Sequence, residues 1–559
     1  MDYKKHIASK LVVDGISQDE IEQLLTVPPQ EMGDMTLPCF KFAKALRKSP
    51  VMIAEEFKNL FSADEYISKV ENVNGYLNFR FNKAPFVKGV LDKITEQQYS
   101  WGSSTEGQGK TICIDYSSIN VAKPFHIGHL STTVIGGSLY KIYKFLGYNV
   151  VGINHLGDYG TQFGKLIYAY KEWGSREAVE KGGVKELMRL YVRYHAEAKE
   201  HPEMDDKARE YFKNIENGAK EENELFVFFK DLTLKEVDKI YKKLNITFDS
   251  YAGESFYNDK MQPVVDELEE KGLLVESDGA KVVMLDEYNM PPCIILRSDG
   301  ASLYATRDLA AAMYRKSTYD FDKCLYVVAY QQNLHFKQFF KVLDLLGKPW
   351  AKDMEHVAFG MVSLEDGAMS TREGKVVFLE EVLDKACEKC LGVINEKNPE
   401  LEDKEKVAEI VGVGAVIFGT LYGGRIKDIT FNYDKVLNFD GETGPYVQYA
   451  CTRCKGVIRR AGNSGAYTIG EIAPDEYALA VELARFPEIV KMAGEKREPS
   501  IVTRYSVDLA QAYNKFYFNC RILGEEENVK NYRLALTECA LYTMTSALSL
   551  LGISVPDKM

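Results

Sequence analysis

The chain has 559 residues, of which 45% are hydrophobic and 27% charged, and its formal net charge is -12. This length exceeds what one hydrophobic core normally supports, so we expect roughly three or four domains. The acidic balance excludes a general nucleic-acid coat protein, which would be basic throughout, although a local basic face can still bind RNA.

Ten cysteines lie scattered among apolar residues, and the start of the chain carries no secretory signal, so we expect a reduced, cytoplasmic protein. Cys387 and Cys390, like Cys451 and Cys454, have the CxxC spacing of many zinc sites. Both pairs lie in helical patterns where cysteines pack as small hydrophobic residues, so we expect no structural zinc. The longest apolar run, 410–418, is too short to span a bilayer, and we expect no membrane role.

Residues 1 to about 104 are expected to form a separate α/β module. Apolar residues between 42 and 57 recur at helical spacing and predict one helix. The run from Val73 to Phe81 alternates between apolar and polar residues, which predicts one half-buried strand. Nothing in this module indicates chemistry, and a Ser- and Gly-rich linker at 103–109 follows it.

The stretch 111–130 begins as an apolar strand, passes through a polar turn and continues as a helix. Strand, turn and helix in this order open a nucleotide-binding α/β unit. His126 and His129 lie three residues apart where the helix begins, so they share a face beside its free N–H groups. There each imidazole can donate to a phosphoryl group, and Gly128 lets a nucleotide approach the backbone.

Two other interpretations of the histidine pair stay open at this point. Zinc hydrolases with paired helical histidines usually have four-residue spacing and an intervening glutamate, and neither feature is present. Structural histidines satisfied within a core fit the spacing as well as phosphate binding does.

A second strand at 148–153 is followed by the polar run 154–164, and such groups lie at the carboxyl edge of a parallel sheet, where ligands bind. Residues 172 to about 247 are rich in Glu and Lys, with apolar residues at helical spacing. This pattern predicts helices inserted between the halves of the nucleotide fold, most of them a solvated spacer.

The second half of the nucleotide fold returns near residue 297. Tyr304 and Asp308 fall on one helical face, and a carboxylate beside an aromatic ring is what a guanidinium group requires. Alternatively, Asp308 is a charge near a helix N-terminus without a ligand. The glycine-flanked run 367–375 offers Ser, Arg and Lys donors that can close over a triphosphate and stabilise departing pyrophosphate.

From about residue 386 onward every clear pattern is helical. The helix expected from Tyr446 carries Arg453, Arg459 and Arg460 with interleaved tyrosines. Basic and aromatic groups on one helix suit a splayed single-stranded loop of RNA, and a solvated helical face is the alternative.

Several of these stretches resemble arginyl-tRNA synthetases, which are class I aminoacyl-tRNA synthetases. The run 120–130, Asn-Val-Ala-Lys-Pro-Phe-His-Ile-Gly-His-Leu, resembles their HIGH signature, and 154–164 resembles their His-Leu-Gly-Asp block. Residues 304–308 resemble their Tyr-x-Thr-Arg-Asp segment, and 367–375 a degenerate KMSKS loop. The resemblance covers essentially the whole chain.

The sequence departs from the family pattern at three places. Tyr159 replaces the usual tryptophan and keeps an aromatic ring, and Ile119 replaces the usual proline. In the loop that resembles KMSKS, Ala368 stands where class I enzymes often have lysine, and Thr371-Arg372 stands where the second lysine is expected. Lys123 just before the HIGH signature is expected to supply the missing charge.

The resemblance implies a multidomain α/β fold with three domains. These are an N-terminal module (1–104) that touches tRNA, a class I Rossmann-type catalytic domain (105–385, helical insertion about 172–247) and an all-α anticodon-binding domain (386–559). It also implies arginine-tRNA ligase activity: ATP and L-arginine form arginyl-adenylate, and the arginyl group passes to the 3′ end of tRNA(Arg). We expect Mg2+ on ATP, no metal ligands in the protein, no editing domain and a monomer.

The resemblance further implies the residues of the site. Catalysis is expected from His126, His129, Lys123, Met369, Ser370 and Arg372. ATP is expected to contact Lys123, His126, Gly128, His129 and Ser370. Arginine is expected to contact Asp115, Ser117, Asn120, Tyr304, Asp308 and Gln332, the last of which could instead cap the following helix. Transfer RNA is expected on Tyr446, Arg453, Arg459 and Arg460.

Two other classes of function share some of these features. A small-molecule nucleotidyltransferase can begin with the same histidine motif, but it would not need the long basic and aromatic helical C-terminus. A non-catalytic tRNA-binding paralogue would keep that C-terminus while losing His126, His129 or Ser370, and all three are retained.

Overall fold

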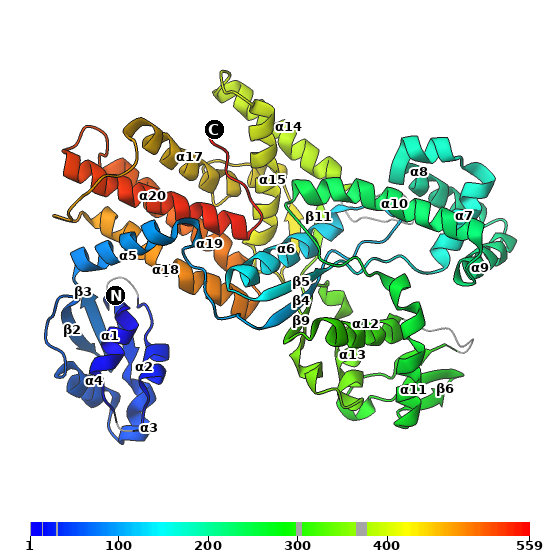
Figure 1. Cartoon of the computed structure of the whole chain (residues 1–559), viewed down its shortest axis with the longest axis horizontal. Helices are drawn as coiled ribbons and strands as arrows, with labels where there is room; N and C mark the ends of the chain where they lie inside the picture. The colour runs from blue at the N-terminus through cyan, green and yellow to red at the C-terminus, as the bar shows by residue number, and fades with distance from the viewer. Residues whose placement is uncertain (1, 14, 29–31, 298–303, 365–376) are drawn as a thin grey trace. The chain divides into compact units, whose positions relative to one another are not determined.

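The computed structural model describes residues 2–13, 15–28, 32–297, 304–364 and 377–559. The chain forms two compact units (Figure 1). One comprises Met1–Trp101, Val457–Arg485 and Gln511–Thr543, and the other comprises Gly102–Gly456, Phe486–Ala510 and Met544–Met559.

An antiparallel sheet in the order β1-β3-β2 forms the N-terminal part of the first unit. Its strands are β1 (Met35–Pro38), β2 (Ile67–Val73) and β3 (Tyr76–Phe81). The strand predicted from Val73 to Phe81 is present as β3 over Tyr76–Phe81, but Val73 belongs to β2. Asn74 and Gly75 adopt φ angles of 52° and 86° and make a hairpin turn, as Asn-Gly pairs favour.

The helices of this part are α1 (Tyr3–Lys10), α2 (Gln18–Leu24), α3 (Ala43–Leu46), α4 (Pro50–Lys58) and α5 (Lys83–Gln97). The single helix predicted between 42 and 57 is interrupted. Arg47 ends α3 in a left-handed conformation, and the Ser49 side chain caps α4. Pro50 then occupies the first turn of α4, where proline lacks no needed hydrogen bond.

A parallel four-stranded sheet in the order β10-β9-β4-β5 lies at the centre of the second unit (Figure 1). Its strands are β4 (Thr111–Asp115), β5 (Asn149–Ile153), β9 (Lys323–Tyr326) and β10 (Met354–His356). The chain runs from β4 outward to β5, then returns to β9 and continues outward to β10, so the order reverses between β4 and β9. Ligands of open parallel sheets bind at the carboxyl ends of the strands at such a reversal. The predicted Rossmann-type fold is confirmed.

Helix α6 (Leu130–Phe145) connects β4 to β5, and almost all of its side chains are buried. Helices α12 (Tyr304–Tyr319) and α13 (Asn333–Leu345) flank β9 in sequence and pack against each other. Leu309, Phe339 and Leu343 belong to the apolar core that these two helices share. Helices from both halves of the fold thus pack against the strands of this sheet.

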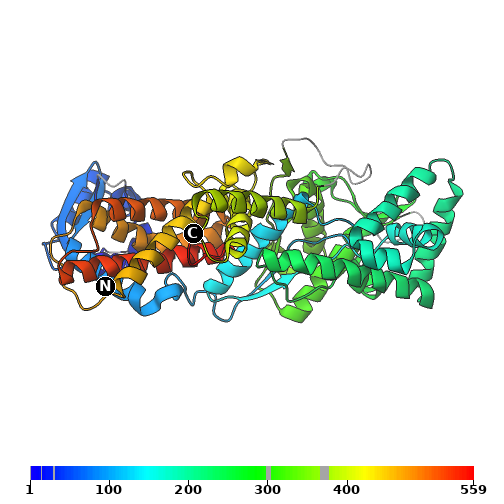
Figure 2. The same ribbon diagram turned by 90° about the horizontal axis from the view of Figure 1, so that it is seen from above.

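The insertion consists of α7 (Thr161–Trp173), α8 (Arg176–Glu197), α9 (Glu203–Glu216) and α10 (Lys220–Lys243). Helices α7 and α9 pack closely, and Figure 2 shows them gathered with α8 in one helical group. The predicted helices are present. The interpretation as a solvated spacer is wrong for α10, because Thr233, Val237 and Tyr241 are buried.

Two further small sheets have no counterpart among the sequence predictions. Strands β6 (Leu274–Ser277), β7 (Ala280–Val283) and β8 (Cys293–Leu296) form an antiparallel sheet after α11 (Gln262–Glu270). Strand β11 (Val362–Leu364) pairs in parallel with β12 (Ile429–Phe431). The latter contradicts the expectation that the chain is entirely helical after residue 386.

The remaining helices are α14 (Leu379–Lys397), α15 (Lys404–Tyr422), α16 (Tyr433–Val436), α17 (Gly444–Ala461), α18 (Pro474–Lys496), α19 (Ser500–Asn519) and α20 (Glu527–Leu550). The CxxC pairs lie in α14 and α17. All ten cysteines are free thiols, and each is buried except Cys387, which is half-buried. Burial raises the pKa of Cys390 and of Cys451 to about 12, so these thiols stay protonated. No helix within the described ranges is long and apolar enough to cross a membrane.

Candidate active site

The histidine pair lies at the start of α6, directly after the loop that follows β4. The Gly128 N–H donates to His126 Nδ1 (3.1 Å), and the His126 N–H donates to His129 Nδ1 (3.3 Å). A neutral imidazole whose Nδ1 accepts a hydrogen bond carries its proton on Nε2. Both rings therefore present an Nε2–H donor.

Both histidines are neutral at physiological pH. Burial, with a smaller contribution from the nearby Lys123 charge, lowers the pKa of His126 to about 4. Burial and the neighbouring His126 lower the pKa of His129 to about 3. The rings lie 4.0 Å apart between centroids. The pair is thus a ready-made double donor that suits phosphate oxygens.

The loop between β4 and the histidines is held in an unusual backbone conformation. The backbone φ angles of Ser117, Ser118 and Ala122 are 71°, 44° and 60°, values that residues other than glycine rarely adopt. The Ser117 hydroxyl shares hydrogen bonds with Thr133 Oγ1 (2.9 Å) and Tyr241 Oη (2.8 Å). With 2% exposure, Ser117 is committed to contacts inside the protein.

Asp115 at the end of β4 already binds a guanidinium group, that of Arg315. Its Oδ2 accepts from an Arg315 nitrogen (2.7 Å), and its Oδ1 accepts from the Ser118 hydroxyl (2.8 Å). Arg315 comes from α12 and is 1% exposed, and it also lies 3.5 Å from His155 Nδ1. Asp115, which was predicted to bind the substrate arginine, is therefore one partner of a buried ion pair with Arg315.

Asn120 lies against the loop that follows β5. The Gly157 N–H donates to the Ile119 carbonyl (2.8 Å), and the Val121 N–H donates to the Gly157 carbonyl (3.1 Å). A Cβ at Gly157 would lie 2.4 Å from Asn120 Oδ1, so a larger residue here would displace the Asn120 side chain. The structure thus joins two loops that the sequence placed at one sheet edge.

Asp158 organises a turn that sequence reasoning did not single out. Its carboxylate accepts hydrogen bonds from the backbone N–H (2.9 Å) and the hydroxyl (2.8 Å) of Ser255 and from Lys230 Nζ (2.6 Å). These bonds fix Glu254, whose carboxyl lies within electrostatic range of Asp308. Burial and the nearby carboxylates raise the pKa of Glu254 to about 7.

No sequence pattern marked Glu254, and its place at the sheet edge is visible only in the structure. Ile153 at the end of β5 pairs with Ser250 by a parallel bridge, so the segment that follows Ser250 also reaches the carboxyl edge of the sheet. A carboxylate four residues beyond such a position fits the rule applied to the other loops.

Asp308 projects from the first turns of α12 toward α13. Its Oδ2 lies 2.6 Å from His335 Nε2. Tyr304, one turn earlier on the same face, is 70% exposed. Gln332 is the N-cap residue of α13, but its side chain makes no capping hydrogen bond, so the capping alternative is wrong and the side chain is exposed.

Arg307 comes directly before Asp308, and its charge acts on the Glu254 carboxyl. Its guanidinium stacks on the Tyr159 ring at 4.2 Å, and one nitrogen lies 3.4 Å from Asn258 Oδ1. The Tyr159 hydroxyl donates to Glu216 on α9. The tyrosine at the position of the usual tryptophan therefore keeps the ring and adds a bond to the insertion.

Met369, Ser370 and Arg372 lie outside the described residues. The chain that follows them is fixed beside the histidines: the Ile127 N–H donates to the Val377 carbonyl (3.2 Å). The Leu379 N–H likewise donates to the Phe125 carbonyl (2.9 Å). The chain from Val377 to Leu379, which follows the predicted loop, thus lies against the segment that carries the histidines.

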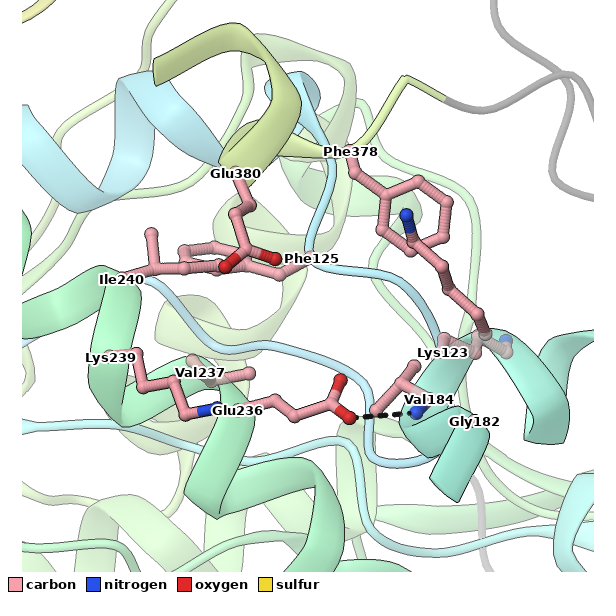
Figure 3. Close-up of a pocket in the computed structure, with 11 residues that line it drawn as sticks. Lys123, Phe125, Gly182, Val184, Glu236, Val237, Lys239, Ile240, Phe378 and Glu380 are labelled. Carbon is pink, nitrogen blue, oxygen red and sulfur yellow. Dashed lines mark hydrogen bonds between the residues drawn. The ribbon is translucent and has the colours of Figure 1, made fainter. Parts of the chain in front are cut away.

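A cavity of about 200 Å3 opens next to Lys123 (Figure 3). Its walls come from the HIGH segment, from α8 and α10 and from the start of α14, and include Phe125, Glu236 and Phe378. The Val184 N–H, beside the kink of α8 at Gly183, donates to Glu236 (3.1 Å). The partly exposed Lys123 therefore borders the insertion as well as the sheet edge.

The four predicted tRNA-binding residues all lie on α17. Arg453 is half-buried and stacks over the Tyr449 ring at 5.0 Å, and Tyr446 is half-buried one turn before Tyr449. Arg459 and Arg460 are exposed in the last turn. The helix thus presents both stacking groups and charges.

Comparison with known proteins agrees with this geometry. Residues 91–433 match the family described as tRNA synthetases class I (R), catalytic domain. Residues 447–559 match the DALR anticodon binding domain, and residues 2–81 match the arginyl tRNA synthetase N terminal domain.

Individual relatives match over their whole length. The chain is 52% identical over 565 residues to an arginine--tRNA ligase of Clostridium beijerinckii and 50% identical over 564 residues to one of Clostridioides difficile, covering 100% of both chains in each case. Its structure is similar to the arginyl-tRNA synthetase of Thermus thermophilus, with a TM-score of 0.86 and 26% identity, over 100% of this chain and 99% of that one.

Proposed function

The chain belongs to the arginyl-tRNA synthetase family, and we propose that it activates L-arginine with ATP and transfers it to the 3′ end of tRNA(Arg). In the first step an oxygen of the arginine carboxylate bonds to the α-phosphorus of ATP, and pyrophosphate leaves. In the second step a terminal ribose hydroxyl of the tRNA attacks the arginyl carbonyl, and AMP leaves. The observation that carries this proposal is the double Nε2–H donor at the sheet reversal.

We propose that the ATP phosphates lie on Lys123, His126, Gly128 and His129, together with Ser370 of the 367–375 loop. Neutral donors fixed before the reaction stabilise charge as it develops on the α-phosphoryl oxygens, without reorganisation. Met369 and Arg372 are proposed to complete this catalytic set. Donor N–H groups suit phosphate oxygens and not a cation, so Mg2+ would be held by the phosphates and would neutralise part of their charge.

We propose that Asp308 and Glu254 bind the arginine guanidinium, with Tyr304 beside it and Gln332 at the rim. His335 holds the Asp308 carboxylate in place. Paired carboxylates recognise a fork-shaped cation through charge-assisted hydrogen bonds.

On the other side of the proposed arginine site, Asn120 is proposed to contact the amino acid directly. The side chains of Asp115 and Ser117 are already bonded within the protein, to Arg315 and Tyr241. We propose that these two residues, which were predicted to contact arginine, act instead by shaping the loop after β4.

The remaining features of the proposal concern the whole protein. We propose domain limits at 1–104, 105–385 and 386–559, with tRNA(Arg) contacting Tyr446, Arg453, Arg459 and Arg460. We propose that the protein is a monomer and that it is cytoplasmic. The free thiols fit a reducing compartment.

The test is exchange of ATP with labelled pyrophosphate for each amino acid, with and without tRNA(Arg). Exchange with arginine alone among the amino acids is the expected result. Exchange with another amino acid would contradict the substrate assignment while leaving the fold. No exchange under any condition, together with tRNA binding, would favour the non-catalytic paralogue.

A further inference from the structure

One face of helix α10 contacts two loops of the proposed active site, the loop after β4 and the loop after β5. Lys230 Nζ pairs with Asp158 (2.6 Å), and Thr233 Oγ1 accepts the Ala122 N–H (3.0 Å). Two turns later, Tyr241 Oη shares hydrogen bonds with the loop after β4 and with Asn154 Nδ2 (2.9 Å) after β5. Residues 230, 233 and 241 share this face because they are separated by nearly whole turns.

Among these contacts, the Thr233 hydroxyl has the most restricted geometry. The side chain is 0% exposed, and its hydroxyl proton is already donated to the Phe229 carbonyl (2.7 Å). The oxygen therefore faces Ala122 as an acceptor only. This direction matters because a buried backbone N–H without a partner is costly.

Ala122 is the point where the loop turns toward the nucleotide-binding residues. Its φ of 60° is unfavourable for alanine and persists only where contacts on both sides hold it. Lys123 follows immediately and borders the cavity that α8 and α10 line. The direction in which the lysine leaves the backbone thus depends on the conformation of Ala122.

We propose that Thr233 is a positioning residue for the reaction: by accepting the Ala122 N–H it fixes the left-handed turn that aims Lys123 at the ATP phosphates. The inference rests on the proposed role of Lys123 in binding ATP. It assigns to the helical insertion a part in nucleotide binding, in place of the spacer role that its composition suggested.

A purely structural role for the threonine is the alternative, and the chain offers a matched control. Thr420 in α15 is also buried, with 4% exposure, and donates to the carbonyl four residues earlier (2.8 Å). Thr420→Val removes the same kind of bond as Thr233→Val, a hydroxyl donation to the carbonyl four residues earlier in the helix. Thr420 is far from the histidine pair in sequence. Only Thr233→Val also removes the acceptor for Ala122.

The experiment measures arginine-dependent exchange of ATP with pyrophosphate in the full-length protein with tRNA(Arg). We expect Thr233→Val to raise KM for ATP about tenfold, because one buried N–H loses its partner. KM for arginine should change less than about twofold, and Thr233→Ser, which keeps the oxygen, should restore KM for ATP. Thr420→Val should leave both constants unchanged.

A Lys123→Met background shows whether the effect runs through the lysine. There Thr233→Val should change KM for ATP by less than about twofold, because coupled residues are not additive. A full tenfold effect in that background, failure of Thr233→Ser to restore KM, or an unchanged KM in Thr233→Val would each overturn the inference alone. Wild-type protein without arginine-dependent exchange would overturn the proposed function, and the inference with it.

Discussion

The two halves of the proposed site are built in opposite ways. On one side, formed by the loop after β4 and the start of α6, hydrogen bonds within the protein occupy Ser117, Asp115 and the Nδ1 atoms of both histidines before any ligand arrives. On the arginine side, where the guanidinium is proposed to bind, Asp308 and Glu254 are two carboxyl groups within electrostatic range of each other, and burial raises the pKa of Glu254 to about 7.

The difference separates stability from affinity. A side that is assembled by internal contacts stabilises the fold, so damage to it should appear first in the free energy of unfolding. A side that holds like charges together gains its missing partner from the substrate. A substitution on that side should change KM and kcat/KM for arginine and leave the free energy of unfolding nearly unchanged.

The largest effect is expected at the buried pair on the assembled side. Arg315→Met leaves the Asp115 carboxylate buried without its cation, and should lower the free energy of unfolding by about 3–5 kcal/mol. Denaturant titration followed by circular dichroism measures this change. The double variant Asp115→Asn/Arg315→Met should recover part of the loss, since no unpaired charge remains. A single variant as stable as wild type would break the comparison.

The next effect is expected on the arginine side. Asp308→Asn removes the negative charge opposite a guanidinium and should lower kcat/KM for arginine about 100-fold. The free energy of unfolding should change by less than about 1 kcal/mol, because the pair with His335 is partly exposed. Steady-state exchange kinetics and the same denaturant titration check both halves of this statement. A large loss of stability with an unchanged KM would reverse the proposed division.

The smallest effect is a pH dependence from Glu254. Its raised pKa of about 7 means that the carboxyl of the free enzyme binds a proton below pH 7, and a bound cation favours the ionised form. Arginine binding then releases a proton, so KM for arginine should fall about tenfold as the pH rises from about 6 to about 8. Arg307, Asp308, Asp158 and Lys123 are the charged neighbours that act on this group.

Glu254→Gln is the control for this pH dependence, because the amide does not titrate. Its KM for arginine should be higher than that of the wild type above pH 7 and nearly flat across the range. An equally steep dependence in the variant would assign the titration to another group.

Local patterns predicted much of the fold, including the strand, turn and helix around the histidine pair. The histidine pair is visible because strand, turn and helix follow one another within 20 residues, and Asp308 because its helix begins with a matched aromatic residue. The Asn74-Gly75 dipeptide is a strong signal for the hairpin turn that the structure shows. The alternation of apolar and polar residues around it nevertheless favoured one continuous strand.

Other features depend on pairings that no local pattern encodes. Arg315 reaches Asp115 across 200 positions, and Thr233 reaches Ala122 across 111. Glu254 gains its environment only when Asp158 fixes the turn around it. The strands β6 to β8 are four residues each, too short for periodicity to separate them from loops.

The ten free thiols make the chain its own reporter of unfolding. Nine are buried and Cys387 alone is half-buried, so a thiol-reactive dye should modify the native protein slowly and at α14. Unfolding would expose the other nine, which are distributed over both compact units. Counting reactive sulfhydryls during denaturation would therefore reveal whether the two units lose structure together or in turn, without any engineered label.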